Sequence, residues 1–144
     1  MYIFYDIGGT STRIGTSLDG KALDSNIMFN TLSDFDDGFK LLVDKTFELL
    51  GNNKAISICA GLPGTLNKEN GSLLHAPHLA GWEGKDISSK LNEIFNCPVH
   101  IENDTALVGL GEAVFGAGRG FGIVAYVTLS TGVGGVKIEN GKVD

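Results

Sequence analysis

Residues 2–18 read "YIFYDIGGTSTRIGTSL", and the fold class follows from the way this segment is built. Residues 2–7 form a nearly uninterrupted apolar run, which predicts a buried β-strand. The glycines at 8–9 predict a tight turn, and the alternating side chains of 11–18 predict a half-exposed return strand. A third strand is predicted over 25–30, after an Asp-Gly turn, so the segment predicts an antiparallel meander.

Beyond the meander, the pattern changes to helices that alternate with strands. The sequence predicts helices over 34–50, 86–95 and 104–115, and further strands over 55–60, 98–102, 122–129 and 133–140. The last two strands are predicted to form a hairpin with its turn at Ser130–Gly132. A meander followed by such alternation predicts an α/β domain with a mixed sheet, antiparallel and then parallel, flanked by helices.

The helix predictions include caps and buried faces. Ser33 is predicted to cap the first helix, with Asp36 at its N3 position. The buried positions are predicted to be Phe35, Phe39, Leu42, Thr46 and Leu49 in the first helix, Ile87, Leu91 and Ile94 in the second, and Ala106, Leu107, Leu110 and Val114 in the third. The continuous apolar strand at 55–60 is typical of a sheet covered on both faces.

The composition is typical of a soluble domain without a nucleic-acid or membrane partner. The 144 residues are 42% hydrophobic and 19% charged, which is enough to form one domain with a real core. The net charge of −6 and the scattered Lys and Arg argue against nucleic-acid binding. Cys59 and Cys97 show no CxxC spacing and are predicted to be buried, reduced thiols. Since no basic leader or bilayer-length apolar run is present, we expect a cytoplasmic location.

Two stretches share one design, in which a strand is followed by a turn rich in Gly and Thr and by a return strand. They are "DIGGTSTR" at 6–13 and "LSTGVGGVK" at 129–137. Glycine leaves the backbone N–H groups unobstructed, and with the Thr hydroxyls they form a concave set of donors for anionic oxygens. The Asp6 carboxylate would suit Mg²⁺ or a water on it. Each stretch alone is also typical of a plain hairpin, and neither is a P-loop or a Rossmann fingerprint.

Two further segments have the features of ligand sites. Residues 59–82 are long, irregular and rich in glycine, as functional loops often are. Their polar groups and Trp82 would suit a polyhydroxylated ligand, although Trp82 in a structured hairpin would serve packing equally well. The stretch "IENDTA" at 101–106 places Asn103 and Asp104 between a strand and a helix. They are either a helix cap or a catalytic base beside a substrate-binding amide.

Five stretches taken in order resemble the ROK family, the sugar kinases and sugar-responsive repressors of the actin-like ATPase superfamily. They are "DIGGT" at 6–10, "GLPG" at 61–64, "HAPHLAGW" at 75–82, "IENDTA" at 101–106 and "STGVGGVKIENGKV" at 130–143. The resemblance implies a ribonuclease-H-like, actin-like ATPase fold for 1–144, as the N-terminal lobe of a kinase whose C-terminal lobe is absent from this chain. It implies glucokinase-like phosphorylation of a hexose or amino sugar by ATP with Mg²⁺. The alternatives are a sugar-sensing repressor and another actin-like phosphotransferase.

The resemblance also implies roles for individual residues. Asp104 would be the general base that takes the proton of the sugar hydroxyl. The sugar would be contacted by Gly64, Thr65, His78 and Asn103. The ATP phosphates would be contacted by Asp6, Gly8, Gly9, Thr10, Thr131, Gly132, Gly134 and Gly135. Asp6 would hold Mg²⁺ through a water molecule.

The chain departs from the family pattern in three respects. Ser130 and Val136 stand where the second phosphate turn usually has glycine, and His78 stands where Asn is common, which leaves the sugar open. The chain ends at Asp144, before the family's further sugar ligands, adenine pocket and Cys-rich zinc site. We therefore expect structural zinc only in the C-terminal lobe, a homodimer for the full-length protein, and little or no activity for this chain alone. Family repressors carry a helix-turn-helix before the first strand, where this chain begins, and this favours the kinase.

Overall fold

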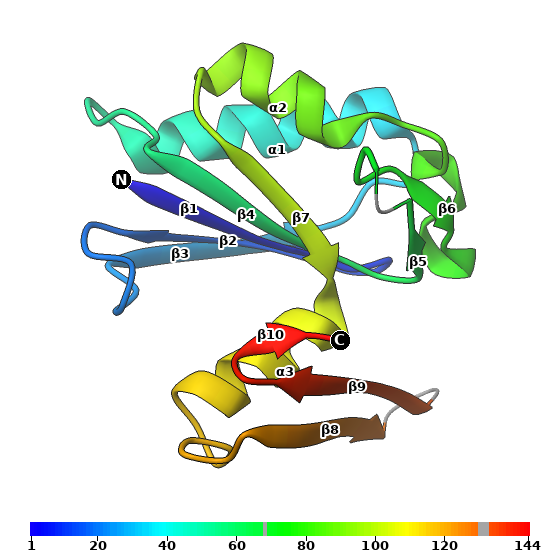
Figure 1. Ribbon diagram of the computed structural model, residues 1–144. Helices are drawn as coiled ribbons and strands as arrows, with labels where there is room; N and C mark the ends of the chain where they lie inside the picture. The colour runs from blue at the N-terminus through cyan, green and yellow to red at the C-terminus, as the bar shows by residue number, and fades with distance from the viewer. Residues whose placement is uncertain (68, 130–132) are drawn as a thin grey trace. The chain divides into compact units, whose positions relative to one another are not determined.

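The computed structural model describes residues 1–67, 69–129 and 133–144, and these fall into two compact units. Unit 1 is Met1–Glu102 and unit 2 is Asn103–Asp144. Figure 1 shows the order of their helices and strands along the chain. No helix in the described part of the chain combines the length and the apolar character needed to cross a membrane.

Unit 1 is built on a five-stranded sheet with the order β3-β2-β1-β4-β7. The strands are β1 (Tyr2–Ile7), β2 (Ser11–Ser17), β3 (Ser25–Asn30), β4 (Ser57–Leu62) and β7 (Val99–Asn103). The first three pair antiparallel, and β1 pairs parallel with β4. Figure 1 draws β7 in the same direction as β4. The predicted mixed sheet, with a meander followed by parallel strands, is therefore confirmed.

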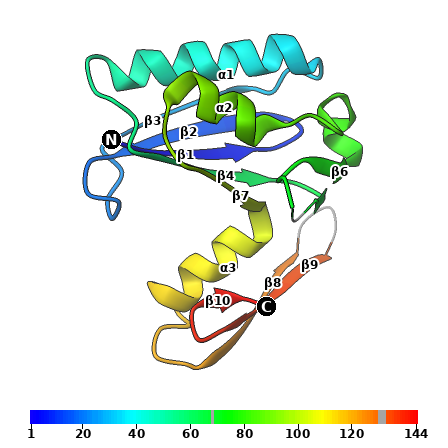
Figure 2. The same cartoon turned by 45° about the horizontal axis from the view of Figure 1, so that its top comes forward.

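The helices α1 (Phe35–Leu50) and α2 (Ile87–Phe95) cover one face of this sheet (Figures 1 and 2). The odd-numbered side chains of β1 point into the core that the helices close, where Ile3 and Ile7 are fully buried. Tyr5 also points there, and its hydroxyl lies 2.9 Å from Thr46 Oγ1 of α1. Since side chains alternate along a strand, Phe4 and Asp6 point to the other face.

The helix boundaries correct two predictions. Asp34 rather than Ser33 caps α1, because its carboxylate accepts the N–H of Asp37 at 3.0 Å. Asp36 is consequently the second helical residue and not N3. Phe35, Leu42 and Thr46 are buried as predicted, whereas Leu50 is buried in place of the only partly buried Leu49.

In α2, Ile87 and Leu91 are buried as predicted, but Ile94 is 42% exposed. Its neighbour Phe95 packs against the core and lies 5.0 Å from the Phe47 ring, between ring centroids. The larger aromatic side chain at the helix end thus takes the place expected for Ile94.

The strand β2 is more buried than its alternation predicted. Within the strand only Arg13 is exposed, and both Ile14 and Gly15 are buried. A Cβ at Gly15 would lie 2.8 Å from Leu23 Cδ2, so the connection between β2 and β3 folds over this strand. A central strand with a loop folded across it loses the solvent-facing side that alternation alone implies.

The described residues of the 59–82 segment contain short regular elements, whereas the sequence predicted an irregular loop. After β4 they form a small two-stranded sheet of β5 (Thr65–Leu66) and β6 (Leu73–His75), followed by the 3₁₀ helix η1 (Pro77–Trp82). Cys59 is half-buried, Cys97 is buried, and both are free thiols. Burial raises the pKa of both thiols. The predicted burial is therefore right for Cys97 and only partly right for Cys59.

Unit 2 consists of α3 (Asp104–Val114) and the three strands β8 (Ile123–Leu129), β9 (Val133–Glu139) and β10 (Lys142–Val143). The predicted β8–β9 hairpin is confirmed, while its turn at 130–132 lies outside the described residues. Gly109 of α3 packs so closely that a Cβ there would lie 2.5 Å from Val136 Cγ1. The predicted inner face of α3 is right for Ala106 and wrong for Val114, which is 38% exposed because it lies at the last turn of the helix.

Candidate functional site

The turn between β1 and β2 contains Gly8, Gly9 and Thr10 of the first predicted phosphate site. The Gly8 N–H donates to the carbonyl of Ser11 at 2.9 Å, which closes the turn. Gly9 lies directly against η1, because a Cβ there would come within 2.3 Å of the His78 carbonyl oxygen. Only glycine allows this approach. The structure therefore brings Gly9, a predicted phosphate contact, against His78, a predicted sugar contact.

The "GLPG" turn approaches the same segment from β4. Gly64 has a positive φ of 83°, and a Cβ there would lie 2.1 Å from the His75 carbonyl oxygen. Thr65, which follows it, is exposed. Since β1 and β4 run parallel, both turns lie at the carboxyl edge of the sheet, where ligands bind in open α/β sheets. Three predicted contact segments of unit 1 thus meet at the backbone of residues 75–78.

This packing makes Gly64 a sensitive position. We expect Gly64→Ala to destabilise the protein by more than the ~1 kcal/mol that a positive φ alone costs, because the carbonyl of His75 must also move. Thermal unfolding of the two proteins measures the difference. Gly84→Ala is the matched control, since Gly84 has a similar φ of 72° and no atom within 4 Å of the added carbon. Equal losses in the two variants would show that the contact with His75 does not matter.

The residues of the 75–83 segment divide into exposed polar and buried apolar groups. His78 is exposed at the turn contact. Glu83 Oε1 accepts the Ala76 N–H at 2.7 Å and lies 3.4 Å from His75 Nδ1, which ties the two ends of η1 together. Trp82 is only 1% exposed, and its Nε1–H donates to the Leu32 carbonyl at 3.0 Å. Of the two roles considered for Trp82, packing is the one the structure supports.

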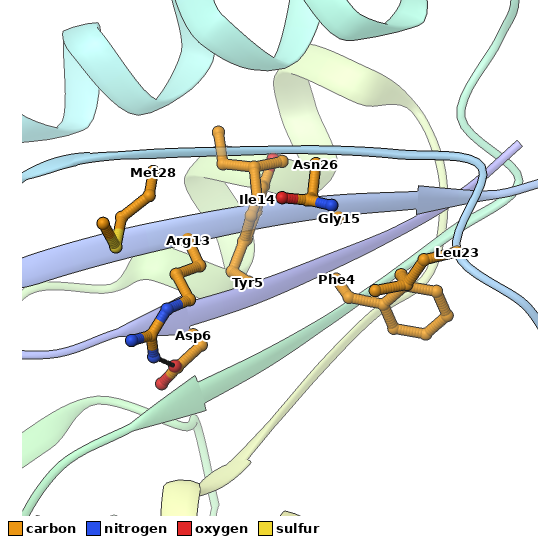
Figure 3. A pocket seen from close by; sticks show the side chains of 9 residues that line it. All are labelled: Phe4, Tyr5, Asp6, Arg13, Ile14, Gly15, Leu23, Asn26 and Met28. Atoms are coloured by element: carbon orange, nitrogen blue, oxygen red, sulfur yellow. Dashed lines mark hydrogen bonds and ion pairs between the residues drawn. The ribbon is translucent and has the colours of Figure 1, made fainter.

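Asp6 lies at the end of β1 on the face away from the helices. Its carboxylate forms an ion pair with Arg13 of β2, with Asp6 Oδ2 2.8 Å from Arg13 Nη1 (Figure 3). Among the described residues, no three His, Cys, Asp or Glu side chains converge as a metal site. One exposed carboxylate nevertheless fits Mg²⁺, which keeps several waters and takes its other ligands from substrate phosphates.

The start of α3 separates the roles of Asn103 and Asp104. The side chain of Asn103 caps the helix, since its Oδ1 accepts the Ala106 N–H at 3.2 Å. Asp104 is the first helical residue, and its Oδ1 accepts the N–H of Thr105 at 2.6 Å. The cap is therefore Asn103, and the idea that Asp104 caps its own helix is wrong. The Asp104 carboxylate is half-buried at the helix N-terminus.

The second Gly/Thr stretch reaches this same helix start within unit 2. A Cβ at Gly134 would lie 3.2 Å from Thr105 Oγ1, so β9 passes close beside the residue that follows Asp104. Gly135 lies against β8, where a Cβ would come within 3.3 Å of the Tyr126 carbonyl oxygen. Val136, at a position where glycine is usual, packs on Gly109 of α3. Thr131 and Gly132, also predicted phosphate contacts, lie outside the described residues.

Arg13 was missed by the sequence reasoning, although a signal for it was present. In a hairpin that turns at Gly9–Thr10, the residue opposite Asp6 is Arg13, and this pairing is observed. A register count from the predicted turn would have found the ion pair.

Comparison with known proteins identifies the class and then the family. The fold is that of an actin-like ATPase domain, as in the sugar kinases that it matches. The ROK family model matches residues 2–144, and the chain belongs to the ROK family.

Individual relatives include both kinases and repressors. The glucokinase of Thermotoga maritima is 32% identical over 139 residues, which cover 94% of this chain and 44% of that protein. The xylose repressor of Bacillus subtilis is 38% identical over 86 residues, covering 59% of this chain and 21% of that protein. A ROK family glucokinase from Streptomyces griseus, solved in complex with glucose and AMPPNP, matches with a TM-score of 0.85 and 26% identity over 99% of this chain and 46% of that one. The chain spans about half the length of the glucokinases that it matches.

Proposed function

We propose that this chain is the N-terminal part of an ATP-dependent sugar kinase that phosphorylates a hexose or amino sugar. The observation that carries the proposal is the contact of Gly9, in the phosphate turn, with the backbone of His78, in the segment expected to bind sugar. Such contact suits an enzyme that must hold the sugar and the phosphates of ATP close together. The similarity to glucokinases supports the same reaction.

Each group has one task in the proposed reaction. The backbone N–H groups of the Gly/Thr turns, apart from that of Gly8, which is bonded to Ser11, would bind phosphate oxygens, and Asp6 would hold Mg²⁺ through water. Mg²⁺ bound with ATP offsets the negative charge of the phosphates. Gly64, Thr65, His78 and Asn103 contact the sugar, with the amide of Asn103 also capping α3.

Asp104 acts as the general base. The oxygen of the sugar hydroxyl forms a bond to the γ-phosphorus of ATP while the bond from that phosphorus to the β,γ-bridging oxygen breaks. The hydroxyl proton passes to the Asp104 carboxylate, and ADP leaves with the bridging oxygen. The helix N-terminus at Asp104 supports a carboxylate in this place.

The test is ADP formation by the full-length protein with ATP, Mg²⁺ and a panel of glucose, mannose, N-acetylglucosamine, N-acetylmannosamine and xylose. We expect ADP release that depends on at least one of these sugars. The second product should be the phosphate ester of that sugar. For the 144-residue chain alone we expect little or no turnover, because closure of two lobes completes such sites. Sugar-independent ADP release, or none with any sugar, would contradict the proposal.

A second candidate is a sugar-responsive regulator, favoured by the similarity to the xylose repressor. It would bind sugar without forming ADP, so a calorimetric titration that shows sugar binding, together with no ADP formation with the same sugar, separates it from the kinase. A cytoplasmic location, a homodimer of the full-length protein, and zinc confined to its C-terminal part stay predictions of the family resemblance.

A further inference from the structure

We infer that Arg13 is a positioning residue for Asp6: its guanidinium holds and neutralises the carboxylate until Mg²⁺ arrives together with nucleotide. The inference rests on the proposed function, in which Asp6 serves Mg²⁺. Its basis is the ion pair between Asp6 Oδ2 and Arg13 Nη1 at 2.8 Å.

The backbone fixes the pair in place. Asp6 and Arg13 lie directly opposite each other in the β1–β2 register, so their side chains leave the sheet on the same face. Their neighbours Tyr5 and Ile14 point the opposite way, into the buried core. The two charged groups are thus held side by side by the strands, and not by the chance meeting of two flexible surface chains.

Among the described residues that line the hollow beside the pair, no second carboxylate is available to the guanidinium. The pair closes one end of a hollow of about 500 Å³ on this face of the sheet (Figure 3). The hollow's apolar walls include Phe4, Leu23 and Met28, and Asp6 and Arg13 are the two charged residues that line it. The apolar side chains supply no acceptor to compete with the carboxylate, and Asn26, which also lines the hollow, offers only an uncharged amide. Both charged side chains stay more than half exposed, 53% for Asp6 and 61% for Arg13.

The charges of Asp6 and Arg13 predict the order in which Mg²⁺ and nucleotide bind. A lone carboxylate attracts a divalent cation, whereas a carboxylate paired with a guanidinium is neutral as a unit and attracts it less. Mg²⁺ carried by a triphosphate brings phosphate oxygens, which are good ligands for a guanidinium. Asp6 can then exchange Arg13 for the Mg²⁺ and its waters, while Arg13 exchanges Asp6 for a phosphate oxygen. Mg²⁺ should therefore bind with the nucleotide and not before it.

The experiment compares Arg13→Gln with the unsubstituted full-length protein in two titrations. Mn²⁺ alone, followed by electron paramagnetic resonance without nucleotide, should bind about two- to fivefold tighter to Arg13→Gln, because an exposed pair is worth up to about 1 kcal/mol. Mg–AMPPNP, followed by calorimetry, should bind about 10- to 100-fold more weakly, because a charge-assisted hydrogen bond is lost. Opposite changes in the two affinities are the signature of the exchange.

Two further variants and one kinetic measurement guard against a purely structural explanation. Arg13→Lys keeps the positive charge, so its affinities for Mn²⁺ and for Mg–AMPPNP should both lie close to those of the unsubstituted protein. Lys40→Gln removes the cation of a similarly exposed ion pair, 2.7 Å from Asp44 on α1, and should change neither. The KM for ATP should rise in Arg13→Gln while the KM for the sugar stays within about twofold of the original, a difference too small to reflect a lost contact.

The outcomes separate the two proposals. If the unsubstituted protein binds Mg–AMPPNP but Arg13→Gln shows unchanged affinity for both probes, the inference about Arg13 is overturned and the kinase proposal stands. If the unsubstituted protein neither binds Mg–AMPPNP nor forms ADP with any sugar, the proposed function is overturned, and the inference falls with it.

Discussion

Asp104→Asn in the full-length protein should lower kcat about 10²- to 10⁴-fold, the usual contribution of a general base. The amide cannot take the hydroxyl proton, yet its oxygen can still accept the N–H of Thr105, as Oδ1 does at 2.6 Å in the native protein. The fold and the start of α3 should therefore survive. Sugar-dependent ADP formation at saturating substrates measures the effect.

A matched control is Asp36→Asn, which removes an exposed carboxylate from the first turn of α1, where no catalytic role is proposed. It should leave kcat unchanged. Retention of near-full turnover in Asp104→Asn would refute the base role. A large rise in the sugar KM with kcat preserved would instead indicate that Asp104 only binds the sugar.

Trp82→Ala should destabilise the protein by about 3–5 kcal/mol, the usual loss for removing a fully buried aromatic side chain. The indole ring lies edge-on against Phe35, with 5.1 Å between ring centroids. It also touches α1 at Gly38, where a Cβ would come within 2.7 Å of Trp82 Cζ2. Losing the side chain opens a cavity between η1 and α1, and urea unfolding followed by circular dichroism measures the loss.

Phe115→Ala is the comparison variant, because Phe115 is 81% exposed and its loss should cost less than about 0.5 kcal/mol. Trp82→Phe separates packing from ligand binding. It keeps a ring but leaves the Leu32 carbonyl without the indole donor, so stability should fall by about 1–3 kcal/mol. An unchanged sugar KM in Trp82→Phe agrees with packing, whereas a large rise would mean that the ring contacts the sugar.

The local pattern of apolar and turn residues was sufficient to predict the order and type of the main helices and strands. The meander, the three α-helices and the β8–β9 hairpin all follow from periodicity and turn residues, which act within a few positions along the chain. The cap at Asp34 was missed because Ser33 and Asp34 are both good capping residues, and only the position of the first helical turn chooses between them.

The functional site likewise divides into features that the local sequence predicts and features that it does not. The glycines at 8–9 and 64 could be recognised as turn residues from their neighbours, because the residue preferences of a tight turn depend on adjacent positions in the sequence. Their contacts with His78 and His75 could not, since those carbonyl oxygens come from residues that are distant in sequence and meet the turns only after the strands pair.

The sequence by itself determined the α/β class, the order of the elements and the family motifs, because these depend on spacing within short segments. Only the tertiary structure decided that Trp82 packs on α1 instead of facing a ligand and that β2 is covered by Leu23. Burial depends on which segments meet in space, and these contacts are set by the whole unit and not by any one stretch.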